Sequence, residues 1–177
     1  MSETTSLKLI NQIISDLDSD QETKILQALA KIPERGTDKV IPVLIKLLEK
    51  DYSDAITGKT TAILSELKNS SSLPALIEGL STESSKVREV ILSSIWHSGL
   101  DASNYLPRIV KAGIAGSYME CVEALTIVEN IDILPSDANI MESLMLLREE
   151  EEKSTKNENS VLLSEMKKII QAMEDSL

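Results

Sequence analysis

The chain has 177 residues, of which 42% are hydrophobic and 2% aromatic, and it contains no phenylalanine. A chain of this length can bury the core of one domain, which Leu, Ile, Val, Ala and Met side chains must fill. The formal net charge is −11, and no Lys or Arg occurs between Ala112 and Leu147. This balance argues against binding to nucleic acid or to an anionic membrane surface, because both need clustered cations.

Cysteine content and hydropathy point to the cytoplasm. Cys121 is the only cysteine, so no intramolecular disulfide can form. The first residues, MSETTSLKLI, contain no basic segment followed by an apolar run and do not resemble a signal peptide. The most apolar short run, Val40–Ile45, contains Pro42 and is far shorter than a membrane span. We therefore expect a soluble cytoplasmic protein.

Helical spacing of apolar residues begins near the N-terminus. The first predicted helix carries Leu7, Ile10, Ile13, Ile14 and Leu17 on one face. Ser19, followed three residues later by Glu22, suggests a capping box at the start of a second helix, which ends before Gly36. Thr37 is expected to cap a third helix, with Pro42 in its first turn or just after it.

The stretch Leu73–Gly99 contains a helix–turn–helix unit that recurs along the chain. Pro74 begins a short apolar helix, a Ser/Thr-rich turn follows at Ser81–Ser85, and Gly99 ends a second amphipathic helix. Prolines recur 32 and 33 residues apart, at Pro42, Pro74 and Pro107. Apolar residues follow each proline at fixed distances, after three residues at Ile45, Ile77 and Val110, and after 21 residues at Ile63, Ile95 and Val128. A period of this size indicates stacked helix pairs, because no single pair buries its own apolar face.

These features resemble a HEAT repeat. The unit has a proline near the start of the second helix, an apolar LxxLI face, a short polar turn, and Val87-Arg88 at the start of the next helix. The resemblance covers roughly residues 20–150, and no short third helix recurs as in the armadillo type. Asp51 resembles the turn aspartate of the family, but serines fill that turn at 81–85, and Val87-Arg88 has no clear counterpart at Ala55-Ile56 or Glu120-Cys121. The resemblance implies an all-α fold, a right-handed superhelix of about five antiparallel helix pairs.

We expect residues 1–177 to form a single HEAT-like α-solenoid domain. In this prediction, residues 1–19 are an N-terminal capping helix, residues 20–152 are the helical repeats, and residues 153–177 are a turn and a C-terminal capping helix. The last helix has an apolar stripe of Leu162, Met166, Ile169, Ile170 and Met173, which can cap the last repeat or form a homodimer seam. The spacing of Glu149 to Lys153 and of Glu152 to Lys156 predicts that the preceding helix continues past the acidic cluster.

Few residues have catalytic potential. His97 is the only histidine, so a multi-histidine metal site is excluded, and we interpret it as partly exposed beside a packed Trp96. Cys121 is expected to be a small buried residue. Gly58-Lys59-Thr60 resembles the end of a phosphate-binding loop, but Ser53 stands where its first glycine would be, and we reject it. We therefore expect no catalytic residue, no metal and no cofactor.

Each of the side chains of Trp96, Met141 and Met145 allows two interpretations, packing in the core or binding a partner. Trp96 is expected in the core rather than exposed as a binding hot spot, because aromatics are so rare in this chain. Met141 and Met145 can line an adaptable groove, although plain packing is the commoner role of such a pair.

The resemblance to HEAT solenoids implies a non-catalytic protein-interaction scaffold or adaptor. Its extended concave groove, lined by the second helix of each pair, is expected to bind a protein partner. The candidate contacts are polar positions on those helices: Lys46, Glu78, Arg108, Lys111 and Glu142. The section 112–152 holds ten acidic residues and one basic residue. Its functional interpretation is a surface for a basic partner, with Glu149, Glu150, Glu151 and Glu152 as further candidate contacts. The alternative interpretation is a solvated acidic surface that contributes only to solubility.

Other functions stay open from the sequence. A self-associating structural subunit would join through the C-terminal amphipathic helix, which leaves a homo-oligomer open. HEAT-like enzymes of the alkylpurine DNA glycosylase family need a basic groove with aromatic contacts, which this acidic, aromatic-poor chain does not favour. HEAT-like lyases that attach bilins are a further enzyme class, and only the fold points to them.

Overall fold

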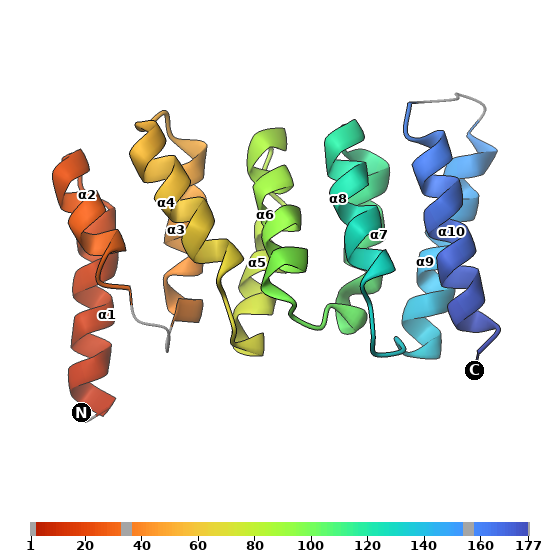
Figure 1. The fold of residues 1–177 in the computed structure, drawn as a ribbon, viewed down its shortest axis with the longest axis horizontal. Helices are drawn as coiled ribbons and strands as arrows, with labels where there is room; N and C mark the ends of the chain where they lie inside the picture. Colours follow the sequence, from red (N-terminus) through yellow and green to blue (C-terminus); the bar gives the residue numbers. More distant parts are fainter. Residues whose placement is uncertain (1–2, 33–36, 154–157, 177) are drawn as a thin grey trace.

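The computed structural model describes residues 3–32, 37–153 and 158–176, and within these ranges the chain is helical with no strand. The ten α-helices of these ranges form five antiparallel hairpins stacked in a row (Figure 1). The helices are α1 (Glu3–Leu17), α2 (Glu22–Leu29), α3 (Ile41–Glu49), α4 (Asp54–Ser65), α5 (Leu73–Gly79), α6 (Ser85–Ser98), α7 (Leu106–Ala115), α8 (Tyr118–Glu129), α9 (Asp137–Glu152) and α10 (Ser160–Glu174). The prediction of an all-α solenoid of about five helix pairs is confirmed.

The hairpins build two layers of helices. Each odd-numbered helix packs on the even-numbered helix that follows it, beginning with α1 on α2. The odd helices form one layer and the even helices the other, with α7 on α9 in the first layer and α4, α6, α8 and α10 in succession in the second. We call their outer surfaces the first-helix face and the second-helix face. The turns inside hairpins lie along the upper edge of Figure 1, the turn edge, and the connections between hairpins lie along the lower edge, the connection edge.

Proline and glycine mark the helix ends as the sequence predicts. Pro42, Pro74 and Pro107 each lie in the first turn of their helix, where the N–H that proline lacks has no partner within the helix. Gly99 ends α6 with a φ of 67°, a left-handed conformation that favours glycine. The predicted start of the third helix is wrong by a few residues. Residues Thr37–Lys39 form a 3-10 turn, and α3 begins only at Ile41.

The predicted capping box at Ser19 and Glu22 does not form. The N-cap of α2 is Gln21, whose side chain makes no capping hydrogen bond, and its N–H donates to the hydroxyl of Ser19 at 3.2 Å. The Glu22 carboxylate instead accepts the N–H of Ser53, in the turn of the next hairpin, at 3.1 Å. A reciprocal capping box does occur at the start of α8. The motif alone cannot show whether the glutamate serves its own helix or the neighbouring repeat.

The core lies between the two layers and contains the residues that recur with the repeat. Ile45, Ile77 and Val110, each three residues after a proline, are buried. Of the residues 21 positions after a proline, Ile95 and Val128 are fully buried and Ile63 is half-buried. The repeat pattern therefore predicted correctly which side of each helix faces the other layer.

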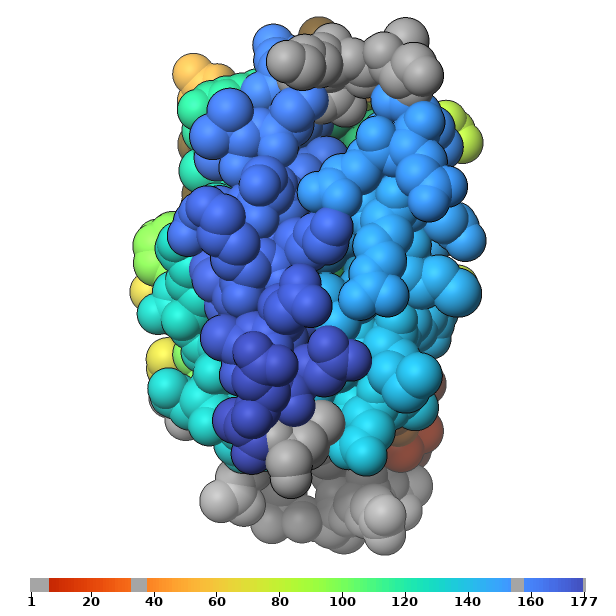
Figure 2. Space-filling view, turned by 90° about the vertical axis from the view of Figure 1, so that its right-hand side faces the viewer, coloured from red at the N-terminus to blue at the C-terminus, as the bar shows by residue number. Residues whose placement is uncertain are grey.

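The apolar stripe of α10 packs inside the chain. Met166 and Ile170 have no exposed surface, and Leu162, Ile169 and Met173 pack partly buried against the core. The helix contacts both α8 and α9, and together α9 and α10 cover the C-terminal end of the stack (Figure 2). The stripe that could have formed a homodimer seam is therefore already occupied.

Polar links join each hairpin to the next along the turn edge. The backbone N–H of Ser53 donates to the Glu22 carboxylate, and the Thr82 hydroxyl donates to the Glu49 carboxylate. Ser85 and Arg88 both donate to the Glu120 carboxylate. The Asn159 amide donates to the Gly116 carbonyl. The linked residues are 31 to 43 positions apart, about one repeat. Such regular links fix the spacing between hairpins.

Candidate functional site

The first-helix face carries two grooves, and the five polar residues predicted on the repeat helices line them. The α3/α5 groove, of about 300 Å³, is lined by Lys46 and Glu78. The α7/α9 groove, of about 380 Å³, is lined by Arg108, Lys111 and Glu142. All five side chains are exposed. The structure thus brings them together on one face, in a group of two and a group of three.

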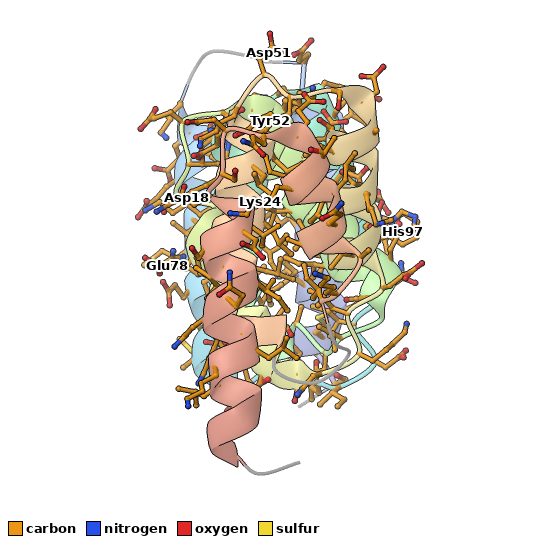
Figure 3. All side chains as sticks on the ribbon, turned by 90° about the vertical axis from the view of Figure 1, so that its left-hand side faces the viewer. Asp18, Lys24, Asp51, Tyr52, Glu78 and His97 are labelled. Atoms are coloured by element: carbon orange, nitrogen blue, oxygen red, sulfur yellow. The ribbon has the colours of Figure 1, made fainter. Side chains whose placement is uncertain are left out.

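The sequence pattern predicts these five residues on the second helix of each pair. This prediction is wrong, because they lie on the first helices. The reason is the pairing of the N-terminal helices. Because α1 packs on α2, each helix that begins with a proline becomes the first of its hairpin. Figure 3, a view along the stack, shows the consequence, with Glu78 on the first-helix side and His97 on the opposite side.

The α7/α9 groove has a distinct electrostatic character. Arg108 and Lys111 lie three residues apart on α7, and no ion pair found among the described residues includes either of them. Glu142 approaches from α9, and Tyr105 adds one aromatic ring. These are the last two cations before the long stretch without Lys or Arg. The groove therefore offers two positive charges for a polar or acidic partner group, next to an acidic surface.

The acidic cluster at the end of α9 is partly neutralised within the chain. Helix α9 ends at Glu152, so the prediction that it continues further is wrong, because Lys153 has extended backbone and ends the helix. Lys153 bonds to Glu150 at 2.7 Å, and Lys167 of α10 bonds to Glu151 at 2.5 Å. The hydrogen bond with Glu150 raises the pKa of Lys153. Glu149 and Glu152 are exposed, and the expected partner of Glu152, Lys156, lies outside the described residues.

Glu120 is a buried carboxylate on the turn edge, and the sequence analysis did not single it out. It has no exposed surface, and it accepts the Nε–H of Arg88 and the hydroxyl of Ser85, both at 2.5 Å, from the preceding hairpin. It also accepts the backbone N–H of Ser117 at 2.8 Å, in the capping box of α8. Arg88 donates a further bond to the carbonyl of Thr82 at 2.7 Å. The pair thus connects α6 to α8.

The pKa of Glu120 makes stability depend on pH. Burial raises this pKa, but the hydrogen bonds from Ser85, Ser117 and Arg88 outweigh it and hold the pKa below its usual 4.5. A lowered folded-state pKa stabilises the fold above the pKa of the unfolded state, and this contribution is lost as pH falls toward the folded value. We expect the urea midpoint to drop as pH falls below about 4.5, and Glu120→Gln to flatten this dependence. Glu129→Gln, an exposed site on α8, should leave the pH profile unchanged.

His97 and Cys121, the two residues with catalytic potential, differ in their exposure to solvent. His97 is exposed, as predicted, with Nδ1 2.8 Å from the carbonyl oxygen of Ser93. Trp96 is half-buried against the core, stacks on His97, and donates its indole N–H to Glu123. Cys121 is fully buried, as predicted, and burial raises the pKa of its thiol to about 11. Among the described residues, no group of three or more His, Cys, Asp or Glu side chains could hold a metal ion.

A third hollow lies on the connection edge, where the C-terminal ends of α6 and α8 and the loops after them come together. We call it the α6/α8 hollow, and its volume is about 420 Å³. It is lined by Ile95, Trp96, Gly99, Leu100, Asp101, Ala102, Ile127, Asn130, Ile131, Asp132 and Ile133. None of the predicted site residues lies in this hollow, although the sequence contains a signal for it. Leu100-Asp101 and Ile131-Asp132 follow two successive second helices at a spacing of one repeat.

Comparison with known proteins agrees with this architecture. The family model for HEAT repeats matches residues 6–96, which is just over half of the chain and covers α1 to most of α6. Neither a curated protein nor a solved structure gives a significant match. Within the described ranges, no helix has the length and apolar character needed to cross a membrane. The last two hairpins continue the stacking of the first three. The chain therefore belongs to the HEAT-repeat family.

Proposed function

We propose that this protein is a non-catalytic, cytoplasmic interaction scaffold that binds a protein partner along its first-helix face. HEAT repeats are generally protein-interaction scaffolds. The observation that carries the proposal is the placement of five exposed polar residues in two grooves of one face. We further propose that residues 1–177 act as one solenoid domain, whose outer helices cap the repeats.

The two grooves would bind different parts of the partner. The α3/α5 groove offers Lys46 beside the carboxylates of Glu78 and Glu49, of which Glu49 already accepts a hydrogen bond from Thr82. The α7/α9 groove offers Arg108 and Lys111 beside Glu142. Grooves on one layer of a rigid stack stay at a fixed separation, which favours a partner that extends along several repeats. Glu149 and Glu152 would add contacts for a basic group of the partner at the turn edge, because intrachain ion pairs occupy Glu150 and Glu151.

The charge and aromatic content of the grooves do not favour the DNA glycosylase alternative. A DNA glycosylase groove needs many cations and several aromatic rings to hold an extruded base. The α7/α9 groove contains two cations, one carboxylate and one aromatic ring, Tyr105. The α3/α5 groove contains no aromatic ring among its lining residues. Mixed charge of this kind suits a protein surface better than a nucleic acid.

The proposal is tested by affinity capture from a lysate of the source cell, with the full chain as bait and mass spectrometry of the salt eluate. The test variant is Arg108→Glu/Lys111→Glu, in the α7/α9 groove. The matched control is Lys59→Glu/Lys86→Glu, which changes the net charge equally at exposed sites on α4 and α6. We expect the groove variant to bind the captured partner at least about tenfold more weakly and the control to bind normally. Equal binding of the captured partner by wild type and groove variant would contradict the proposal.

A further inference from the structure

We propose that the α6/α8 hollow is a second binding site, which takes a basic side chain flanked by apolar residues from an extended segment of a partner protein. This inference deepens the proposed function and rests on it. The first-helix face supplies mixed charge, whereas the α6/α8 hollow combines apolar walls with an acidic opening on a different edge of the stack.

The walls of the hollow suit the hydrocarbon part of a long side chain. Six of the eleven lining residues are aliphatic, and among them Ile133 is 58% exposed. Trp96 adds an aromatic wall, and its orientation is fixed by the indole hydrogen bond to Glu123 at 2.5 Å. Lys and Arg bury their methylene stems along such surfaces while the charged head stays in contact with polar groups. The hollow is therefore a preformed slot for a stem with a polar end.

The charged groups of the hollow favour a cation at that end. Asp101 and Asp132 are in the lining, and no Lys, Arg or His is. The hollow also lies at the C-terminal ends of two helices, where the helix dipole is negative. The adjacent section of chain contains no Lys or Arg between Ala112 and Leu147. The nearby Lys68 bonds to the Ser98 carbonyl at 3.3 Å and does not line the hollow.

The two aspartates have different roles. Asp101 accepts the N–H and the hydroxyl of Ser103 at 3.0 and 3.1 Å, so it shapes the loop after α6. Asp132 is exposed, and no hydrogen bond or ion pair found among the described residues includes it. Asp132 is therefore the carboxylate that is ready to bind a cation. A second copy of this chain is disfavoured as the occupant, because two chains with a net charge of −11 each repel one another.

The test uses a library of random nine-residue peptides displayed on phage and selected on the full-length protein. Selected peptides are synthesised and titrated while the emission of Trp96, the only tryptophan, is recorded. We expect the selected sequences to be enriched in Arg or Lys next to an apolar residue, and their binding to change the Trp96 emission. Substitution of that basic residue by glutamine in the synthetic peptide should abolish the change.

Variants of the protein locate the site. Asp132→Asn and Ile133→Ser should each weaken binding about fivefold or more, and raised salt should weaken it further. Asp137→Asn, the same chemical change at an exposed position outside the hollow, should leave the affinity unchanged. Selection of no peptide, selection without basic residues, or equal affinity for all variants would each overturn the inference. The groove variant Arg108→Glu/Lys111→Glu should still bind the peptides. The experiments can therefore contradict the proposal for the α6/α8 hollow and the proposal for the first-helix face independently.

Discussion

Replacing Arg88 with alanine is expected to lower the free energy of unfolding by about 3–5 kcal/mol, the usual effect of removing one partner of a buried ion pair. Glu120 has no exposed surface and Arg88 is its only cationic partner among the ion pairs found in the described ranges. Without the guanidinium, the carboxylate would stay buried with only the hydrogen bonds from Ser85 and Ser117. Urea unfolding followed by circular dichroism at neutral pH measures the effect.

Two further variants separate the ion pair from a general loss of charge. Arg148→Ala removes an exposed arginine of α9 and should change the free energy of unfolding by no more than about 0.5 kcal/mol. Arg88→Met/Glu120→Leu replaces both charges by apolar groups and should recover part of the loss, because no unpaired charge then remains buried. A value for Arg88→Ala as small as that for Arg148→Ala would show that the link between α6 and α8 contributes little to stability.

Met166→Lys is expected to destabilise the fold by a similar amount, about 3–5 kcal/mol, because it places an unpaired charge where α10 packs on α8 and α9. Met166 has no exposed surface, whereas Val161, in the first turn of the same helix, is 79% exposed. Val161→Lys is therefore the matched control and should change stability by no more than about 0.5 kcal/mol. Urea unfolding and light scattering on both variants give the answer.

The same experiment decides between the two uses of the α10 stripe. If the stripe packs within the chain, Met166→Lys lowers the unfolding midpoint, and the native protein keeps the molar mass of the wild type. If the stripe were a homodimer seam, wild type would be a dimer whose stability rises with protein concentration, and the variant would become a monomer. The burial of Met166 and Ile170 predicts the first outcome.

The architecture could be predicted from the sequence because the same pattern occurs in several repeats, and agreement between the repeats strengthens each prediction. The helix-starting prolines and the apolar positions at fixed distances after them agree across three units, so the predicted faces of the helices were correct. The pairing of the helices is a different kind of information. Every helix in a solenoid has neighbours on both sides, so the pattern fits either pairing, and only the packing of α1 on α2 decides it.

Individual polar contacts were harder to predict than the fold. The Glu22 side chain bonds to the next hairpin, while Glu120 bonds both to its own helix and to the preceding hairpin, and local sequence does not distinguish the two cases. The α6/α8 hollow is formed by two loops about one repeat apart, and each loop alone looks like an ordinary helix end. Such sites depend on contacts between repeats, and aligning the repeats is the step that would have found this one.

The most direct test of the scaffold proposal is hydrogen–deuterium exchange of the full chain with and without its captured partner. If the first-helix face is the binding surface, the partner should slow exchange in α3, α5, α7 and α9 and leave α4 unaffected. Occupation of the α6/α8 hollow would add slower exchange in the loops after α6 and α8. Slower exchange confined to the second helices α4, α6, α8 and α10, with α3, α5 and α7 unaffected, would contradict the proposal.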